Sequence, residues 1–300
     1  KQMYEQGVIE KQLFSMCFNF QLDVKKEGTL AGAMSLGGVD ERLWKTPVVY
    51  ASRVNSSGFY GVSIRAVYLW EGSEGAFSGI AGVTKSGQNI LKIDMDEKSI
   101  MSVSTIIDSG TSDTYLNIIM EKAFNKAWME MVGSEYTNFE RSLTHDEVMQ
   151  FPTIIIQLQG DSSRLPENTI GFASSLDPQN PNDVLIAIPP TGYFEFNEKM
   201  RHYTARFYVN RQGQNVLGAN TIMGNDVVFD IDNNRIGWAE SDCDYNDLLD
   251  IGRLDTMERR VEINVNDKTD GDANKGATEV AKEDTDVAAN EKKDGGANKD

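Results

Sequence analysis

The first 240 residues alternate short apolar runs with polar turn residues, as expected of a chain built mainly from β-strands. The runs are rich in β-branched and aromatic residues and are bounded by Gly, Ser, Asn and Asp. Four early runs predict strand structure, at residues 12–22, 58–70, 89–93 and 99–108. Later, two apolar runs flank Asn233-Asn234, and Asn tolerates the positive φ that tight hairpin turns need. The pattern therefore predicts a mostly β fold.

The clearest helical periodicity lies between residues 120 and 131. Apolar side chains recur there at helical spacing, at Met120, Ala123, Phe124, Ala127, Trp128 and Met131. Gly133 is placed to end this helix, because glycine readily adopts the left-handed conformation common at helix C-termini. Thr144 and Glu147 form a capping-box pattern that predicts a short helix before a strand at Phe151. The apolar stripe of the longer helix indicates core packing rather than a binding surface.

Composition divides the chain near residue 263. With 40% hydrophobic residues, the 300-residue chain can bury a sizeable core. From Asn264 to Asp300, however, the sequence is dominated by Asp, Glu, Lys, Asn, Ala and Gly and holds no aromatic residue. Such a segment cannot bury a core. We expect a domain at 1–245, a poorly defined extension at 246–262 and a disordered acidic tail at 263–300.

The charge of the chain argues against two classes of partner. Its 46 acidic and 29 basic residues give a formal net charge of −17. A strongly acidic protein is repelled by nucleic acid and by anionic membrane surfaces. No run reaches the roughly 18 apolar residues that a membrane span needs, and none has the pattern of a signal peptide.

The strongest candidate for chemistry is the segment Ile106-Ile107-Asp108-Ser109-Gly110-Thr111-Ser112. Its two isoleucines predict a buried strand end that presents Asp108 at its tip. Gly110 allows a close backbone approach, and the hydroxyls of Ser109, Thr111 and Ser112 can hydrogen-bond the carboxylate and its loop. A carboxylate held in this way is a candidate base. The alternative is an ordinary surface turn, since Asp, Ser, Gly and Thr are common turn residues.

Seven further segments occur in the order expected of the second lobe of a pepsin-like protease. They are Tyr4–Lys11 with Leu13–Ser15, Ser35–Asp40, Gly58–Tyr60, Phe151–Ile154, Ile188–Tyr193, Val216–Ala219 and Val228–Ala239. Together with the aspartate segment, they make the chain resemble the C-terminal lobe of pepsin-like aspartic endopeptidases over about residues 1–245. The resemblance implies a mostly β lobe of the bilobal acid-protease fold, with short helices and polypeptide substrates.

The same resemblance implies roles for the loop residues. Asp108 would be one carboxylate of a two-aspartate dyad that activates a water molecule against the peptide bond. Ser109 stands where the family usually has a Thr whose hydroxyl braces the two catalytic loops. Gly110 would offer its backbone N–H near the dyad, and Thr111 would hydrogen-bond the outer carboxylate oxygen.

Residues outside the loop also match the family pattern. Ile106 and Phe59 match positions that line substrate pockets on the leaving-group side. Leu217 and Gly218 belong to a segment that lies against the catalytic strand, where a side chain at Gly218 would crowd the Asp108 loop.

The mechanism of the family needs a second aspartate, and the sequence has no other Asp-Thr/Ser-Gly loop after an apolar strand. The flap tyrosine of the family's first lobe is also absent. The resemblance therefore implies a partner N-terminal lobe upstream, and a chain that is inactive alone and exposes apolar surface around Ile106, Leu217 and Gly218. Two alternatives stay open. One is a non-catalytic protease-like binding protein or decoy, and the other is a homodimer of this lobe.

Both cysteines lie in segments that come close in the resembling fold. Cys17 falls in the first strand and Cys243 follows the last one, so the resemblance implies a disulfide. The alternative is two unrelated free thiols. A disulfide suits the secretory pathway and an extracellular, vacuolar or lysosomal protein, although no leader is visible. Asn55, in Asn55-Ser56-Ser57, is a glycosylation candidate consistent with this route.

Other chemistries find little support. His145 and His202 are the only histidines, and neither sits in a nucleophile or metal-ligand motif. Ala33–Gly37 superficially resembles the nucleophile elbow of serine hydrolases, but that elbow requires a following helix. Around Asp270-Gly271-Asp272, the glycine and the distal Glu of a calcium loop are not at the required offsets. We expect no metal and no cofactor.

Overall fold

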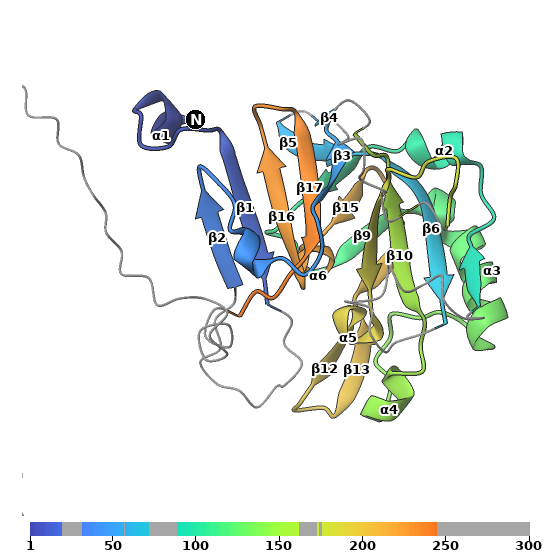
Figure 1. Cartoon of the computed structure of the whole chain (residues 1–300). Helices are drawn as coiled ribbons and strands as arrows, with labels where there is room; N and C mark the ends of the chain where they lie inside the picture. Colours follow the sequence, from blue (N-terminus) through green and yellow to red (C-terminus); the bar gives the residue numbers. More distant parts are fainter. Residues whose placement is uncertain (20–31, 57, 72–88, 162–172, 174–175, 245–300) are drawn as a thin grey trace, which may run out of the picture. The chain divides into compact units, whose positions relative to one another are not determined.

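The computed structural model describes residues 1–19, 32–56, 58–71, 89–161, 173 and 176–244 (Figure 1). All of them belong to one compact unit, Lys1–Met257. A second unit, Glu258–Asp300, lies outside the described residues, as do the predicted extension and acidic tail.

Strands dominate the described part of the chain, which confirms the predicted mostly β class. The strands are β1 (Leu13–Phe18), β2 (Gly32–Leu36), β3 (Val49–Ser52), β4 (Val54–Ser56), β5 (Phe59–Val62), β6 (Ile64–Trp70), β7 (Ile90–Lys92), β8 (Thr105–Ile107), β9 (Thr114–Asn117), β10 (Thr153–Leu158), β11 (Val184–Ile188), β12 (Phe194–Asn197), β13 (His202–Ala205), β14 (Phe207–Arg211), β15 (Asn215–Leu217), β16 (Asn225–Asp230) and β17 (Arg235–Glu240). The helices are α1 (Gln2–Glu5), α2 (Glu97–Met101), α3 (Glu121–Val132), α4 (His145–Val148), α5 (Pro190–Tyr193) and α6 (Ala219–Ile222), with 3-10 turns η1 (Glu41–Leu43) and η2 (Ile118–Met120).

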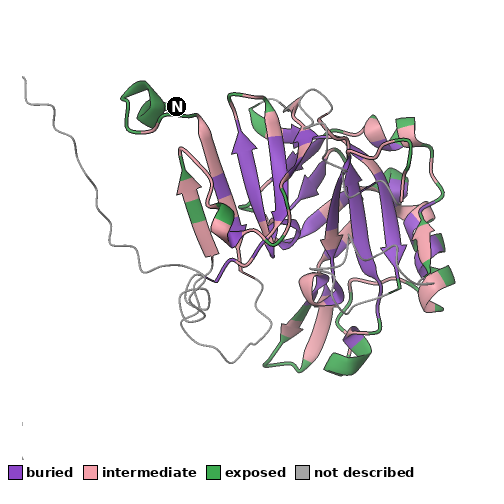
Figure 2. Ribbon diagram, in the orientation of Figure 1, coloured by how far each residue is buried: buried purple, intermediate pink, exposed green. Residues whose placement is uncertain are grey.

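Three sheets and one isolated hairpin organise these strands. The sheets have the orders β2-β1-β16-β17-β3, β11-β10-β6-β7 and β14-β9-β15-β8-β5-β4, and β12 pairs with β13. One large apolar cluster collects side chains from all three sheets and from α3. Figure 2 shows buried residues running along the central strands β6, β10 and β16. The sheets therefore share a core that fixes their strand ends relative to one another.

Local sequence signals are confirmed where a single residue type controls the backbone. Helix α3 ends at Gly133, which adopts a φ of +76°. Thr144 and Glu147 form the reciprocal capping box at α4. Asn234 has a φ of +53° in the turn between β16 and β17, whose antiparallel pairing begins at Asp230 and Arg235.

Two strand predictions were wrong in their extent. Residues 97–101 form helix α2 instead of a strand, because the Asp96 side chain accepts a hydrogen bond from the Ser99 N–H and caps the helix. The run 58–70 is two strands, β5 and β6, which join different sheets. The predicted strand at 12–22 is described only to residue 19, and β1 ends at Phe18.

A disulfide joins Cys17 of β1 to Cys243, which follows β17, with Cα atoms 5.3 Å apart. Both cysteines are buried and pack with Leu43. The structure thus confirms the expected pairing and excludes two free thiols.

Two carboxyl groups on the strands beside this disulfide are held away from water. Burial raises the pKa of Asp226, although hydrogen bonds from Trp44 and Ser15 oppose the shift. Burial also raises the pKa of Glu240 to about 7, with the charge of Lys45 opposing it. Both groups therefore keep their protons to a higher pH than an exposed carboxyl group would.

The raised pKa of Glu240 predicts a loss of stability towards neutral pH. A carboxyl group whose folded pKa exceeds its unfolded pKa stabilises the fold fully below the ordinary value of about 4.3. Its contribution disappears as the pH rises through about 7. We therefore expect the urea midpoint of the wild-type protein to fall between pH 4.5 and pH 7.5. The midpoint of Glu240→Gln should fall by less over the same range. Glu135→Gln, at an exposed site, is the control. Equal falls in wild type and Glu240→Gln would contradict this account.

Candidate active site

Asp108 follows β8, which runs between β15 and β5 in the six-stranded sheet. Ile106 and Ile107 are buried, whereas Asp108 is partly exposed. Its backbone N–H donates to the Leu217 carbonyl oxygen at 3.0 Å, so β15 holds the first residue of the loop. The apolar strand therefore ends where the carboxylate reaches the surface.

Both oxygens of this carboxylate accept hydrogen bonds from its own loop. The Gly110 N–H donates to Asp108 Oδ1 at 3.0 Å, and Thr111 Oγ1 donates to Asp108 Oδ2 at 2.6 Å. The Thr111 N–H also donates to the Asp108 carbonyl oxygen at 3.1 Å. Charge-assisted bonds of this kind fix the orientation of a carboxylate.

The two serines of the loop do not hydrogen-bond the Asp108 carboxylate. Ser109 and Ser112 are exposed, and neither hydroxyl makes a hydrogen bond to Asp108 within the described structure. The carbonyl oxygen of Ser112 instead accepts from the Asn220 N–H at 3.2 Å. Of the three hydroxyls expected to hydrogen-bond the carboxylate or its loop, that of Thr111 bonds the carboxylate.

Gly218 lies where a side chain has no room. β15 pairs in parallel with β8, and a Cβ at Gly218 would lie 2.0 Å from the Asp113 carbonyl oxygen and 2.6 Å from that of Thr111. The next residue, Ala219, donates its N–H to the Thr111 carbonyl at 2.7 Å. The contact predicted between the Leu217-Gly218 segment and the loop is thus present.

The expected apolar exposure at this site was wrong. Ile106 is 3% exposed and Leu217 is fully buried, and Gly218 is buried as well. Ile106 is flanked in the sheet by Gly61 and Val216, which leaves little of it open. Phe59 of β5, in contrast, is 51% exposed.

An ion pair at the far end of the loop was not foreseen from the sequence. Arg206 Nε donates to Asp113 Oδ1 at 3.0 Å, and the Asp113 side chain is only 10% exposed. Asn220 joins them by donating its side-chain amide to the Arg206 carbonyl at 3.1 Å. Arg206 lies 93 residues from Asp113 and lacks a local motif, so no pattern signalled the contact.

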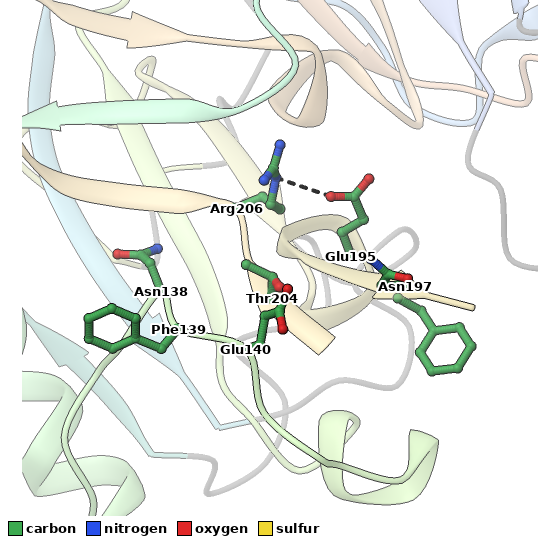
Figure 3. A pocket seen from close by; sticks show the side chains of 8 residues that line it. Asn138, Phe139, Glu140, Glu195, Asn197, Thr204 and Arg206 are labelled. Atoms are coloured by element: carbon green, nitrogen blue, oxygen red, sulfur yellow. Dashed lines mark ion pairs between the residues drawn. The ribbon is translucent and has the colours of Figure 1, made fainter. Parts of the chain in front are cut away.

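One cavity adjoins the loop, and a second cavity shares part of its wall. One, of about 420 Å³, is lined by Ser112, Asp113, His145, Val148, Thr191, Gly192, Phe194, Glu195, Phe196, Tyr203, Arg206, Asn220 and Met223. The other, of about 550 Å³, is lined by Asn138, Phe139, Glu140, Glu195, Phe196, Asn197, Thr204 and Arg206 (Figure 3). Glu195, Phe196 and Arg206 line both, whereas Ile106 and Phe59 line neither.

The remaining candidates stand apart from Asp108. His145 begins α4, and His202 Nδ1 lies 3.7 Å from Glu140 Oε2. Asn55 lies in β4 opposite Tyr60, and the last residue of its sequon is outside the described residues. Among the described residues, no cluster of His, Cys, Asp or Glu could hold a metal ion, and no helix could span a membrane.

Comparison with known proteins and protein families identifies the family to which this chain belongs. A search of the curated proteins returned no match. The family model described as eukaryotic aspartyl protease matches residues 1–241, which include the Asp108 loop and all strands described above. Proteins of this family act as aspartic-type peptidases on peptide substrates and are typically secreted or vacuolar. The chain belongs to the eukaryotic aspartyl protease family.

Proposed function

We propose that this protein is an aspartic endopeptidase in which Asp108 supplies one of two catalytic carboxylates. The observation that carries the proposal is the Asp108 carboxylate itself, which ends a buried strand with both oxygens held by Gly110 and Thr111. A carboxylate fixed in this way costs no reorganisation when it handles a proton.

The chemistry needs a second carboxylate about 3 Å away. Two carboxylates at that distance cannot both ionise, so they share one proton. The pair activates a water molecule, whose oxygen attacks the carbonyl carbon of the scissile peptide bond. The water proton passes to the ionised carboxylate while the protonated carboxyl donates to the carbonyl oxygen. Asp108 would be one member of this pair.

An N-terminal lobe outside this chain would supply the other member. The sequence offers no second Asp-Thr/Ser-Gly loop, so residues 1–245 would act as the C-terminal lobe of a two-lobed enzyme of the secretory pathway. The exposed Ser109 hydroxyl, which makes no hydrogen bond to Asp108, would brace the facing loop. Phe59 would border the substrate on the leaving-group side through its exposed ring, whereas the predicted contribution of Ile106 is not kept because its side chain is buried.

The 300-residue chain alone is expected to show no peptidase activity. Hydrolysis of a denatured protein is measured at about pH 4 over a range of chain concentrations, beside the full-length protein and the Asp108→Asn chain. The full-length protein should cleave and the isolated chain should not. Activity of the chain that rises with the square of its concentration and vanishes in Asp108→Asn would indicate a homodimer instead. An inactive full-length protein would contradict the peptidase proposal.

A further inference from the structure

The cavity beside the catalytic loop and the second cavity that shares its wall carry an excess of negative charge. Three carboxylates line them, from Asp113, Glu140 and Glu195, and the guanidinium of Arg206 is the one fixed cation among their lining residues. Among the lining residues, carboxylates therefore outnumber guanidinium groups by two.

Two of these carboxylates share the same guanidinium. Arg206 Nε lies 3.0 Å from Asp113 Oδ1. It also lies 3.2 Å from Glu195 Oε2, and Figure 3 shows this second ion pair. Asp113 is nearly buried, so removing its cation would leave an uncompensated charge out of water. Glu195 is 65% exposed, and an exposed ion pair contributes little. Arg206 therefore stays with Asp113, and the exposed Glu195 carboxylate, held only weakly by Arg206, can also bind a second cation.

The position of Glu195 places its exposed carboxylate in the cavity next to the proposed catalytic loop. Glu195 lines the same cavity as Ser112 and Asp113, which are four and five residues beyond Asp108. The neighbouring cavity continues from Glu195 to Phe139, whose ring is 83% exposed. An aromatic surface of this kind suits the methylene stem of a long cationic side chain.

We propose that these cavities form a substrate subsite that selects a lysine or arginine side chain, with Glu195 as the residue that determines this specificity. The inference rests on the proposed peptidase function and adds the class of substrate. An acidic side chain is disfavoured there, because the guanidinium it would approach already faces two carboxylates.

Peptide binding to the full-length Asp108→Asn protein tests the subsite without cleavage. The probes are uncharged, end-blocked octapeptides in which one lysine is moved along the chain, each paired with norleucine or glutamate at the same position. Dissociation constants are measured by titration calorimetry at pH 7 and low salt. At one position, lysine should bind about fivefold more tightly than norleucine. Raising the salt should weaken this preference.

Variants then assign the preference to one carboxylate. Glu195→Gln should bring the lysine-to-norleucine ratio close to one, and Glu195→Lys should favour glutamate. Glu198→Gln is the matched control, because Glu198 is exposed, directly follows the same strand and lines neither cavity. It should keep the wild-type ratio.

The inference is overturned if no position prefers lysine, including the case in which no peptide binds, or if the preference survives in Glu195→Gln. Hydrolysis by the protein with Asp108 intact is scored separately. A lysine preference in a protein that cleaves nothing would refute the peptidase function and leave the cation subsite standing.

Discussion

Replacing both Cys17 and Cys243 with alanine is expected to lower the free energy of unfolding by about 5 kcal/mol. The disulfide closes a loop across 226 residues, and a cross-link of that span removes much of the freedom of the unfolded chain. It ties β1 to the segment after β17, at a point where both cysteines are buried against Leu43. Loss of the link also removes sulfur packing at that site.

Urea unfolding of the oxidised protein and of the double alanine variant measures this effect. Wild-type protein treated with a thiol reductant is the control, since it loses the cross-link and keeps both sulfur atoms. Both should unfold at much lower urea than the oxidised protein. A loss below about 1 kcal/mol in the variant would show that strain or residual unfolded structure offsets the cross-link.

The parts of this fold that follow from the sequence are those set by one residue or by a short pattern. Gly133 ends α3 and Thr144 caps α4 because their effects act within one helical turn. The cap that Asp96 provides for α2 is equally local, but the apolar and β-branched residues of the run 99–108 led to the prediction of a strand. Competition between cap and strand propensity is decided by packing, which the sequence does not display.

Contacts between distant segments were harder to foresee. The Thr111 bond to Asp108 spans three residues and was expected, whereas the Arg206 bond to Asp113 spans 93 and was not. The two isoleucines correctly predicted a buried strand end. The expected apolar exposure around Ile106 failed for a related reason, since its closure depends on β5 and β15 lying on either side. The side chains that complete the two cavities depend on the same long-range pairing.

Asp108→Asn is expected to reduce peptide hydrolysis by at least about a thousandfold while the fold is retained. The amide has the shape of the carboxylate, but it cannot carry the charge or exchange the shared proton of the dyad. Asn can still accept from the Gly110 N–H, and the Thr111 hydroxyl can rotate to accept from the new amide. The melting temperature should therefore change little.

The most direct test of the account is the turnover of a denatured protein substrate at about pH 4 by the full-length enzyme, its Asp108→Asn variant and an Asp94→Asn control. Asp94 is suited to this control because its side chain is 85% exposed and pairs only with the exposed Lys126 across the described surface. We predict that Asp94→Asn keeps wild-type turnover and that Asp108→Asn loses it at an unchanged melting temperature. Undiminished turnover by pure Asp108→Asn protein would contradict the assignment of Asp108 as a catalytic carboxylate.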